Sequence, residues 1–212
     1  MHRIYYLLAL LAFVVFGITG CEKQKDRSLP VDADGNVYDT VPIGDQVWLK
    51  ENLKTTTFID GTPIPLLTDD NEWSITSSGA NCWYSNDPGT NKDKYGALYN
   101  WYSVESGLLC PVGWHVPTHE EWTVLIDYLT GEFLAGSKMK EVGTVHWSIP
   151  NLDANNISVF TALPGGERNK SGTFEFMNHY CLFWSSTELN STESYSISLS
   201  YLDSHVLVHD KK

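Results

Sequence analysis

Residues 118–131 read THEEWTVLIDYLTG, and this stretch predicts the best-defined helix of the chain. Thr118 and Glu121 have the spacing of a capping box, in which the hydroxyl and the carboxylate each satisfy a backbone N–H that the first turn leaves unpaired. Four apolar residues then follow at the spacing of one helix face: Trp122, Leu125, Ile126 and Leu129. Gly131 is the expected C-cap. The stretch therefore predicts an amphipathic helix that packs one face on a core.

Short strand-like segments lie on both sides of this helix. Val37–Val41 and Gln46–Lys50 predict an early hairpin. Five later segments are rich in β-forming residues and separated by turn residues: Ile157–Leu163, Thr173–Phe176, Leu182–Ser186, Tyr195–Tyr201 and His205–Val208. Further helices are expected over Tyr95–Gly107 and Leu134–Glu141, whereas residues 86–94 are expected to be a loop. Two main helices in the middle and antiparallel strands at both ends predict an α+β domain.

The N-terminus has the pattern of an export signal. Arg3 precedes an apolar run, Ile4–Phe16, which is too short to span a bilayer, and a polar segment follows after residue 21. Residues 18–21, ITGC, resemble the bacterial lipobox, in which a peptidase cuts before a cysteine that carries diacylglycerol. We therefore expect a signal peptide at residues 1–20 and a lipid on Cys21. The alternative is an ordinary signal peptide, in which a cysteine occupies position 21 by chance and carries no lipid.

This pattern also predicts the organisation and location of the chain. Residues 21–33 form the lipidated cysteine and a flexible tether, and residues 34–212 form one domain. The protein is expected in the cell envelope, held to a membrane by its lipid, and the outer membrane of a Gram-negative bacterium is the expected site. The mixed charges of residues 22–26 leave open which face of that membrane carries the domain.

The net charge restricts the classes of ligand, and the cysteine content restricts the possible disulfides. The formal net charge of −12 argues against binding nucleic acid or anionic lipid by charge alone. Besides Cys21, three cysteines remain, and they cannot all pair within one chain. Two alternatives remain. Cys82 and Cys110 could form a disulfide, or Cys82, Cys110 and Cys181 could all be buried thiols. No cysteine or histidine spacing predicts a zinc site.

Five ordered stretches resemble a known family. They are IGDQVWLKENL at 43–53, YGALYNW at 95–101, CPVGWHVPT at 110–118, FTALPGGER at 160–168 and FWSSTE at 183–188. Together they resemble the Fibrobacter succinogenes major paralogous domain, which is found in secreted and lipid-anchored proteins of Bacteroidetes and Fibrobacter relatives. The resemblance covers residues 34–209. It implies the C-type lectin-like fold, shared with domains of the formylglycine-generating type, and it implies no particular reaction.

The sequence does not predict an active site. His115 is interpreted as a core or turn histidine, and no nucleophile elbow surrounds Ser185. Cys181 lacks the second cysteine that formylglycine generation implies. Glu121 is expected to cap its helix, and Glu167–Arg168 is expected to be a weak surface ion pair. The chain is therefore predicted not to be an enzyme, and a polysaccharide-acting enzyme is the third alternative.

No metal ion or cofactor is predicted. Asp32-x-Asp34-x-Asn36 resembles the start of a calcium loop, but position 12 of that loop holds Ile43 instead of glutamate. This segment is interpreted as a turn. The oxygen-rich segments at residues 69–72 and 86–87 could coordinate a hard cation such as calcium, yet solvated loops have the same composition. Calcium binding is therefore possible but unsupported by the sequence.

Aromatic side chains in or next to loops offer another route to a ligand. Loops on a rigid scaffold commonly carry binding residues, so Trp83, Asn86, Asp87 and Trp147 are the predicted surface contacts. The alternative for each is packing beneath a long loop. The leading hypothesis is a lipid-anchored binding or adhesion protein whose ligand is a glycan or a partner protein. The runner-up is a purely structural component of the envelope.

Overall fold

The computed structural model describes residues 28–190 and 193–211, which form an α+β domain with small antiparallel sheets. The signal peptide and Cys21 lie outside the described residues. The helices are α1 (Asp70–Ile75), α2 (Pro88–Tyr95), α3 (Trp101–Glu105), α4 (His119–Tyr128) and α5 (Glu132–Met139), with a 3-10 turn at Tyr84–Asn86. The strands are β1 (Thr40–Ile43), β2 (Gln46–Leu49), β3 (Asn81–Cys82), β4 (Leu98–Tyr99), β5 (Glu167–Arg168), β6 (Phe174–Glu175), β7 (Tyr180–Asn190), β8 (Glu193–Ser200) and β9 (Val206–Lys211). The predicted α+β class is confirmed.

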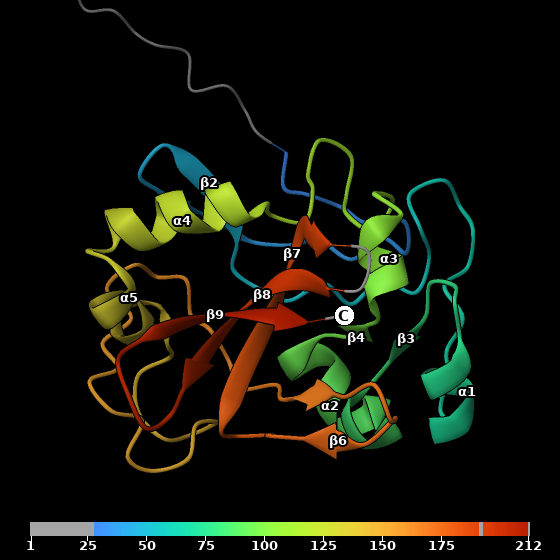
Figure 1. Ribbon diagram of the computed structural model, residues 1–212. Helices are drawn as coiled ribbons and strands as arrows, with labels where there is room; N and C mark the ends of the chain where they lie inside the picture. The colour runs from blue at the N-terminus through green and yellow to red at the C-terminus, as the bar shows by residue number, and fades with distance from the viewer. Residues whose placement is uncertain (1–27, 191–192, 212) are drawn as a thin grey trace, which may run out of the picture.

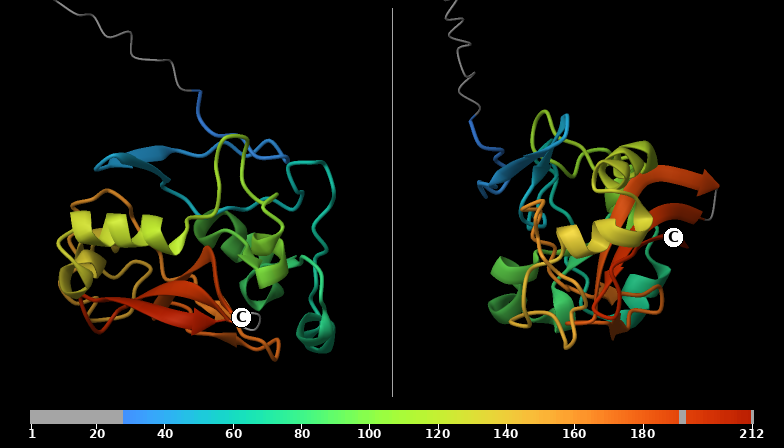
Figure 2. Two further views of the ribbon diagram at one scale, coloured as in Figure 1. Left: turned by 45° about the horizontal axis from the view of Figure 1, so that its top comes forward. Right: turned by 90° about the vertical axis from the view of Figure 1, so that its left-hand side faces the viewer.

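The early hairpin forms as predicted, although its first strand begins at Thr40, three residues later than expected. β1 and β2 pair antiparallel, with Ile43 opposite Gln46, so only two residues form the turn. Gly44 has a φ of 61° in this turn, a conformation that glycine adopts without strain. In both views of Figure 2 the blue hairpin lies apart from the red β7–β9 sheet.

The principal sheet has the strand order β7-β8-β9, and β8 lies at its centre. The alternation in Tyr195–Tyr201 predicts a strand buried on one face only. In the structure both faces of β8 are buried, because neighbouring side chains on β7 and β9 also enclose the small serines. Ser198 is 1% exposed, and its hydroxyl lies 2.7 Å from Nε2 of His209 on β9.

The largest core joins the hairpin, α4, α5 and the principal sheet. α4 has the predicted capping box, and its buried face presents Trp122, Leu125 and Ile126. These pack with Trp48 of β2 and with Ile197 of β8. Figure 1 shows α5 at one end of the molecule and α1 at the opposite end. A second, smaller cluster surrounds α3, and a third lies next to α1.

The prediction of one helix over Tyr95–Gly107 is wrong in its bounds. Residues 88–95 form α2, where a loop is predicted, and α3 is a separate helix of five residues. The start of α2 has a clear cause: the Asp87 carboxylate accepts the N–H of Thr90, and Pro88 occupies the first turn. The dipeptide Pro88-Gly89 therefore opens a helix instead of a turn.

Residues 157–163 are irregular instead of the predicted strand. Val159 and Thr161 each have a φ of 61°, which no regular strand contains. The side chain of Asn156 fixes this path, because its oxygen accepts the N–H of Thr161 at 2.9 Å and its amide donates to the Thr161 hydroxyl at 2.8 Å. The apolar content that predicts a strand is explained by Phe160 and Ala162, which fill the largest core.

A buried ammonium group ties the loop that contains Leu152 to the end of β8 and to the turn that follows it. Lys140 is fully buried, and its Nζ donates to the carbonyl oxygens of Leu152 at 3.0 Å, Ser200 at 2.8 Å and Asp203 at 2.7 Å. Its three N–H donors are thus satisfied by three loop and sheet carbonyls.

Within residues 28–190 and 193–211, no helix is long and apolar enough to cross a membrane.

Candidate functional site

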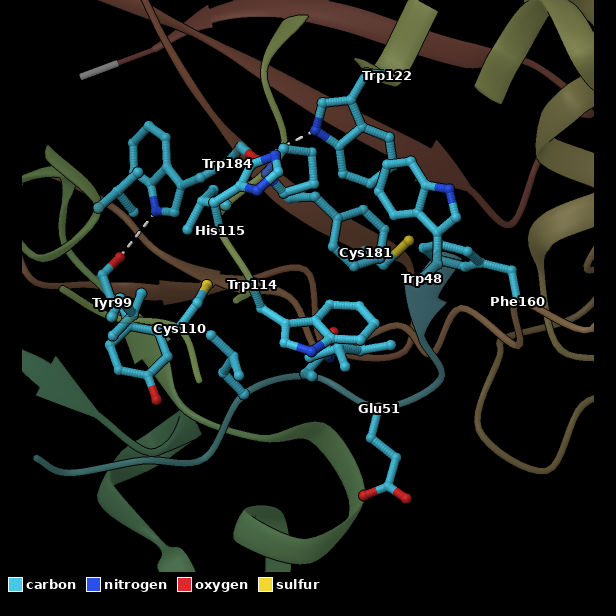
Figure 3. A pocket seen from close by; sticks show the side chains of 18 of the residues that line it. Trp48, Glu51, Tyr99, Cys110, Trp114, His115, Trp122, Phe160, Cys181 and Trp184 are labelled. Atoms are coloured by element: carbon cyan, nitrogen blue, oxygen red, sulfur yellow. Dashed lines mark hydrogen bonds between the residues drawn. The ribbon is translucent and has the colours of Figure 1, made fainter. Parts of the chain in front are cut away.

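A cavity of about 690 Å³ opens between β2, the loop of residues 109–117, β7 and the segment 160–166. We call it the aromatic cleft. Its size is that of a site for a small molecule or a short oligomer. Figure 3 shows aromatic side chains from these separate segments converging on it: Trp48, Tyr99, Trp114, Trp122, Phe160 and Trp184.

Most of these rings are fixed by one another and by hydrogen bonds. The rings of Trp48 and Trp122 lie 4.8 Å apart, and Trp48 also packs edge-on against Phe160 at 5.8 Å. The indole N–H of Trp122 donates to the Trp184 carbonyl at 3.3 Å, and that of Trp184 donates to the Tyr99 carbonyl at 2.9 Å. Since Trp48 and Trp122 are buried, they form a rigid base for the cleft.

Trp114 differs from the other tryptophans of the cleft. It is half-buried and lies on the loop between Cys110 and Pro117, near the centre of Figure 3. Within the described residues, its indole N–H makes no hydrogen bond and its ring stacks on no other ring. A partly exposed indole with an unused donor is the kind of group that stacks on a ligand ring and donates to a ligand hydroxyl. Trp114 is therefore the best candidate for a ligand contact.

A histidine–carboxylate pair lies at the rim. Nε2 of His115 is 2.9 Å from Glu121 Oε1, and the side chains of both residues are partly exposed. Glu121 also accepts the N–H of Thr118 at 2.8 Å, and this contact completes the capping box. Burial opposes ionisation of Glu121, but the hydrogen bonds from Thr118 and His115 outweigh it and lower the pKa of its carboxyl. The rim thus carries a carboxylate that stays ionised at neutral pH.

Further polar groups come from β2 and the residues that follow it. The Gln46 amide donates to the Glu121 carbonyl at 3.0 Å, and the Asn52 amide donates to the Tyr95 carbonyl at 2.9 Å, so both side chains are oriented. Glu51 lies at the edge, and its carboxylate points away from the labelled rings in Figure 3. A smaller cavity of about 330 Å³ adjoins the cleft and shares Glu51 and Asn52 with it. The side chains of Glu51 and Asn52 therefore form part of the lining of both cavities.

Two thiols line the aromatic cleft. Cys110 and Cys181 both contribute to its wall, and Cys82 packs next to α1 instead. All three are free thiols in the structure; Cys82 and Cys181 are buried, and Cys110 is partly buried. Burial raises the pKa of Cys110 and of Cys181 to about 12. Thiols with such values are protonated at neutral pH and are poor nucleophiles.

The predicted contacts Trp83, Asn86 and Asp87 lie close together but do not line the cleft. Trp83 is 5% exposed, and Nζ of Lys92 lies 5.4 Å from the centre of its ring. The Asn86 amide donates to the Thr68 carbonyl at 2.9 Å, and Asp87 caps α2. Trp83 is therefore packed, whereas Asn86 and Asp87 are exposed and make local structural hydrogen bonds.

Trp147 lies in another part of the domain, within the largest core. It is 1% exposed, and its indole N–H donates to the Ala162 carbonyl at 3.0 Å. Such burial leaves no face of the ring for a surface ligand.

His119, in the first turn of α4, is also more enclosed than that position suggests. Its ring stacks on the ring of Tyr195, with the two ring centres 4.2 Å apart.

The calcium-like segment forms a turn, as predicted. Asp32 Oδ1 accepts the N–H groups of Asp34 at 3.0 Å and Asn36 at 2.9 Å, while Oδ2 accepts the Tyr38 hydroxyl at 2.6 Å. Both oxygens of the Asp32 carboxylate are thus occupied by donors of the protein itself, which disfavours coordination of a cation there. Residues 69–72 belong to the cap and first turn of α1. In the described part of the chain, no three His, Cys, Asp or Glu side chains gather as a metal site.

The sequence holds a signal for Trp114 that periodicity alone misses. Its loop contains Pro111, Gly113 and Pro117, so it cannot be a helix or a central strand. A tryptophan in such a loop has no periodic partners to bury it. His115 belongs to the same loop, and the structure places it at the exposed rim and not in the core.

The chain was compared with known proteins. The family model described as the Fibrobacter succinogenes major domain matches residues 41–210, which is most of the chain. No curated protein and no solved structure matches it.

Proposed function

This chain belongs to the Fibrobacter succinogenes major domain family, and from that premise we propose that it is a lipid-anchored envelope protein whose domain binds a carbohydrate. The domain is proposed to have the C-type lectin-like fold. Helices packed around small antiparallel sheets agree with that fold at the level of class. The lipid on Cys21 is supported by the lipobox-like residues 18–21.

The observation that carries the proposal is Trp114 on the wall of the aromatic cleft. Sugar rings have apolar faces that stack on aromatic rings and hydroxyls that need donors and acceptors. Trp114 offers an unstacked ring and an unused N–H, and the oriented amides of Gln46 and Asn52 and the carboxylate of Glu121 lie around the same cavity. An apolar cleft with a few convergent polar groups is typical of a binding site.

Binding is favoured over hydrolysis by the state of the carboxylates. A glycosidase needs a carboxylic acid with a raised pKa that can protonate the leaving oxygen. The pKa of Glu121 is lowered, and its oxygens are occupied by Thr118 and His115. Because this carboxylate holds a helix cap, it is poorly suited to give up a proton. We therefore propose a binding protein and not a polysaccharide-acting enzyme.

A glycan array tests the carbohydrate proposal. Residues 22–212, which contain every described residue, are applied with and without calcium, next to Trp114→Ala and Phe133→Ala. Phe133 is the control because it is an aromatic residue that is 73% exposed and lies outside the cleft. We expect binding that Trp114→Ala weakens at least tenfold and Phe133→Ala leaves unchanged, since truncation of a central tryptophan contact commonly costs about 2 kcal/mol or more of binding free energy. Equal binding by both variants would refute the proposed site.

The anchor is tested separately in cells. In the full chain, Cys21→Ser should abolish incorporation of labelled fatty acid and release the protein from membranes, because a lipid supplies the proposed attachment. Cys82→Ser is the matched control, since it removes a cysteine that lies in the domain. Continued lipid labelling of Cys21→Ser would show that the attachment lies elsewhere.

A further inference from the structure

The charges around the aromatic cleft are of one sign. Its lining includes the carboxylates Asp45, Glu51 and Glu121, and no lysine or arginine is among the described residues that line it. Among the described residues of its wall, the one histidine is His115, which is paired with Glu121. A cavity with this lining disfavours an anionic ligand, because a buried or half-buried negative group needs a positive partner.

The aromatic walls add to this preference. The face of an indole or phenyl ring carries partial negative charge, so a cation over the ring is attracted to it. Trp114 has no ring partner among the described residues, and no basic side chain lies over it. By contrast, Lys92 lies over Trp83 and Arg168 lies over Trp73, outside the cleft. The ring that faces the cavity therefore still offers its face to a cation.

The nearest lysines do not cancel this field. Lys54 lies between Glu51 at 3.9 Å and Asp93 at 3.8 Å, so its charge is shared by two carboxylates. Lys50 and Lys94 line the smaller adjoining cavity, where Asp39 and Asp93 accompany them. The net charge of −12 adds a long-range attraction for cations.

We propose that the carbohydrate bound in the aromatic cleft carries a protonated amine, as an amino sugar with a free amino group does. This inference rests on the proposed carbohydrate binding and specifies its chemical class. The sugar ring stacks on Trp114, and the ammonium group lies in the field of the rim carboxylates. Acetylation of the amine removes the positive charge, and a uronic acid places a negative charge in the same cavity.

Three oligosaccharides of similar length test this charge preference by calorimetry on residues 22–212. They are oligomers of glucosamine, N-acetylglucosamine and galacturonic acid, which are cationic, neutral and anionic. We expect the glucosamine oligomer to bind about tenfold more tightly than the neutral one, in line with a cation–π contact and partial charge pairing. No binding of the anionic oligomer is expected.

Variants distinguish binding in the aromatic cleft from non-specific attraction of a cation to an acidic protein. Trp114→Ala should remove the binding of the glucosamine oligomer, and the double variant Asp45→Asn with Glu51→Gln should weaken it several-fold without affecting the neutral oligomer. Both altered side chains are exposed, so the fold should persist. Glu132→Gln, an exposed position on α5 outside the cleft, is the matched control and should bind as the unaltered protein does.

The possible outcomes keep the two proposals apart. Equal binding of the cationic and neutral oligomers would overturn the charge inference and leave carbohydrate binding standing. The inference would also fail if Trp114→Ala kept the preference for glucosamine, since the attraction would then arise elsewhere. If none of the three oligomers binds, the inference falls, and the array alone decides whether the domain binds carbohydrate at all.

Discussion

Nε2 of His115 lies 2.9 Å from both carboxylate oxygens of Glu121, and the same carboxylate accepts the backbone N–H of Thr118. One side chain thus serves two purposes: it closes the capping box of α4 and it fixes the rim of the aromatic cleft. The stability of the helix and the charge of the rim therefore depend on the ionisation of Glu121.

The first prediction concerns pH. The pKa of Glu121 is lower in the folded chain, so its stabilising effect is complete above its unfolded pKa and disappears as pH falls through the folded value. Glu121→Gln should therefore lower the free energy of unfolding at pH 7 by up to about 1 kcal/mol, and the difference should shrink as pH falls through the folded pKa. Urea unfolding followed by tryptophan fluorescence measures both values. A difference that stays constant with pH would contradict the role of the charge.

The second prediction concerns the buried ammonium of Lys140. Lys140→Met should destabilise the domain by about 3 kcal/mol, because the carbonyls of Leu152, Ser200 and Asp203, which are buried or partly buried, lose their donor. Lys138→Met is the control, since that lysine donates only to the Thr130 hydroxyl at the surface. Thermal unfolding compares the two variants. Equal losses would mean that the three contacts contribute little net stability.

The third prediction concerns Arg168. Its guanidinium is fully buried between the rings of Trp73 and Phe174, at 4.7 and 4.8 Å, and donates to the Leu67 carbonyl at 2.6 Å. Arg168→Lys should destabilise the domain by about 2–3 kcal/mol, because an ammonium lacks the planar fork that stacks and donates in several directions.

Asp70→Ala is the control for Arg168. It removes the 2.8 Å ion pair with the same guanidinium, and the Asp70 carboxylate in this pair is 67% exposed. We expect a loss below about 1 kcal/mol, as for other exposed ion pairs. Chemical denaturation gives both values, and a larger loss for Asp70→Ala would place the stabilising effect in the ion pair.

Local chemistry explains why the sequence predicts some elements and not others. The capping box at Thr118 and the two-residue turn at Gly44 act over a few residues, so both α4 and the hairpin are found from sequence alone. The same reasoning fails at Pro88, because Asp-Pro-Gly is compatible with both a turn and a helix start. The Asp87 cap decides for the helix.

Residues held by distant partners escape such reasoning. Glu167–Arg168 resembles a surface ion pair in sequence, but Arg168 is buried and its carboxylate partner, Asp70, is nearly a hundred positions away in the chain. Trp147 and Trp114 both lie near turn residues, yet one is enclosed by the core and the other lines a cleft. Only the tertiary packing separates these two tryptophans, so the sequence alone could not place the candidate site.

The last prediction concerns the thiols, where sequence leaves two alternatives. Burial raises the pKa of Cys82 to about 11 and that of Cys110 to about 12, so thiolate is scarce at pH 8 and a disulfide reagent should react slowly with folded residues 22–212. After denaturation without reductant, we expect three thiols per chain, and Cys110→Ser should reduce this to two. A Cys82–Cys110 disulfide, formed on export to an oxidising compartment, would instead leave one titratable thiol, that of Cys181. Intact mass before and after alkylation distinguishes the two results.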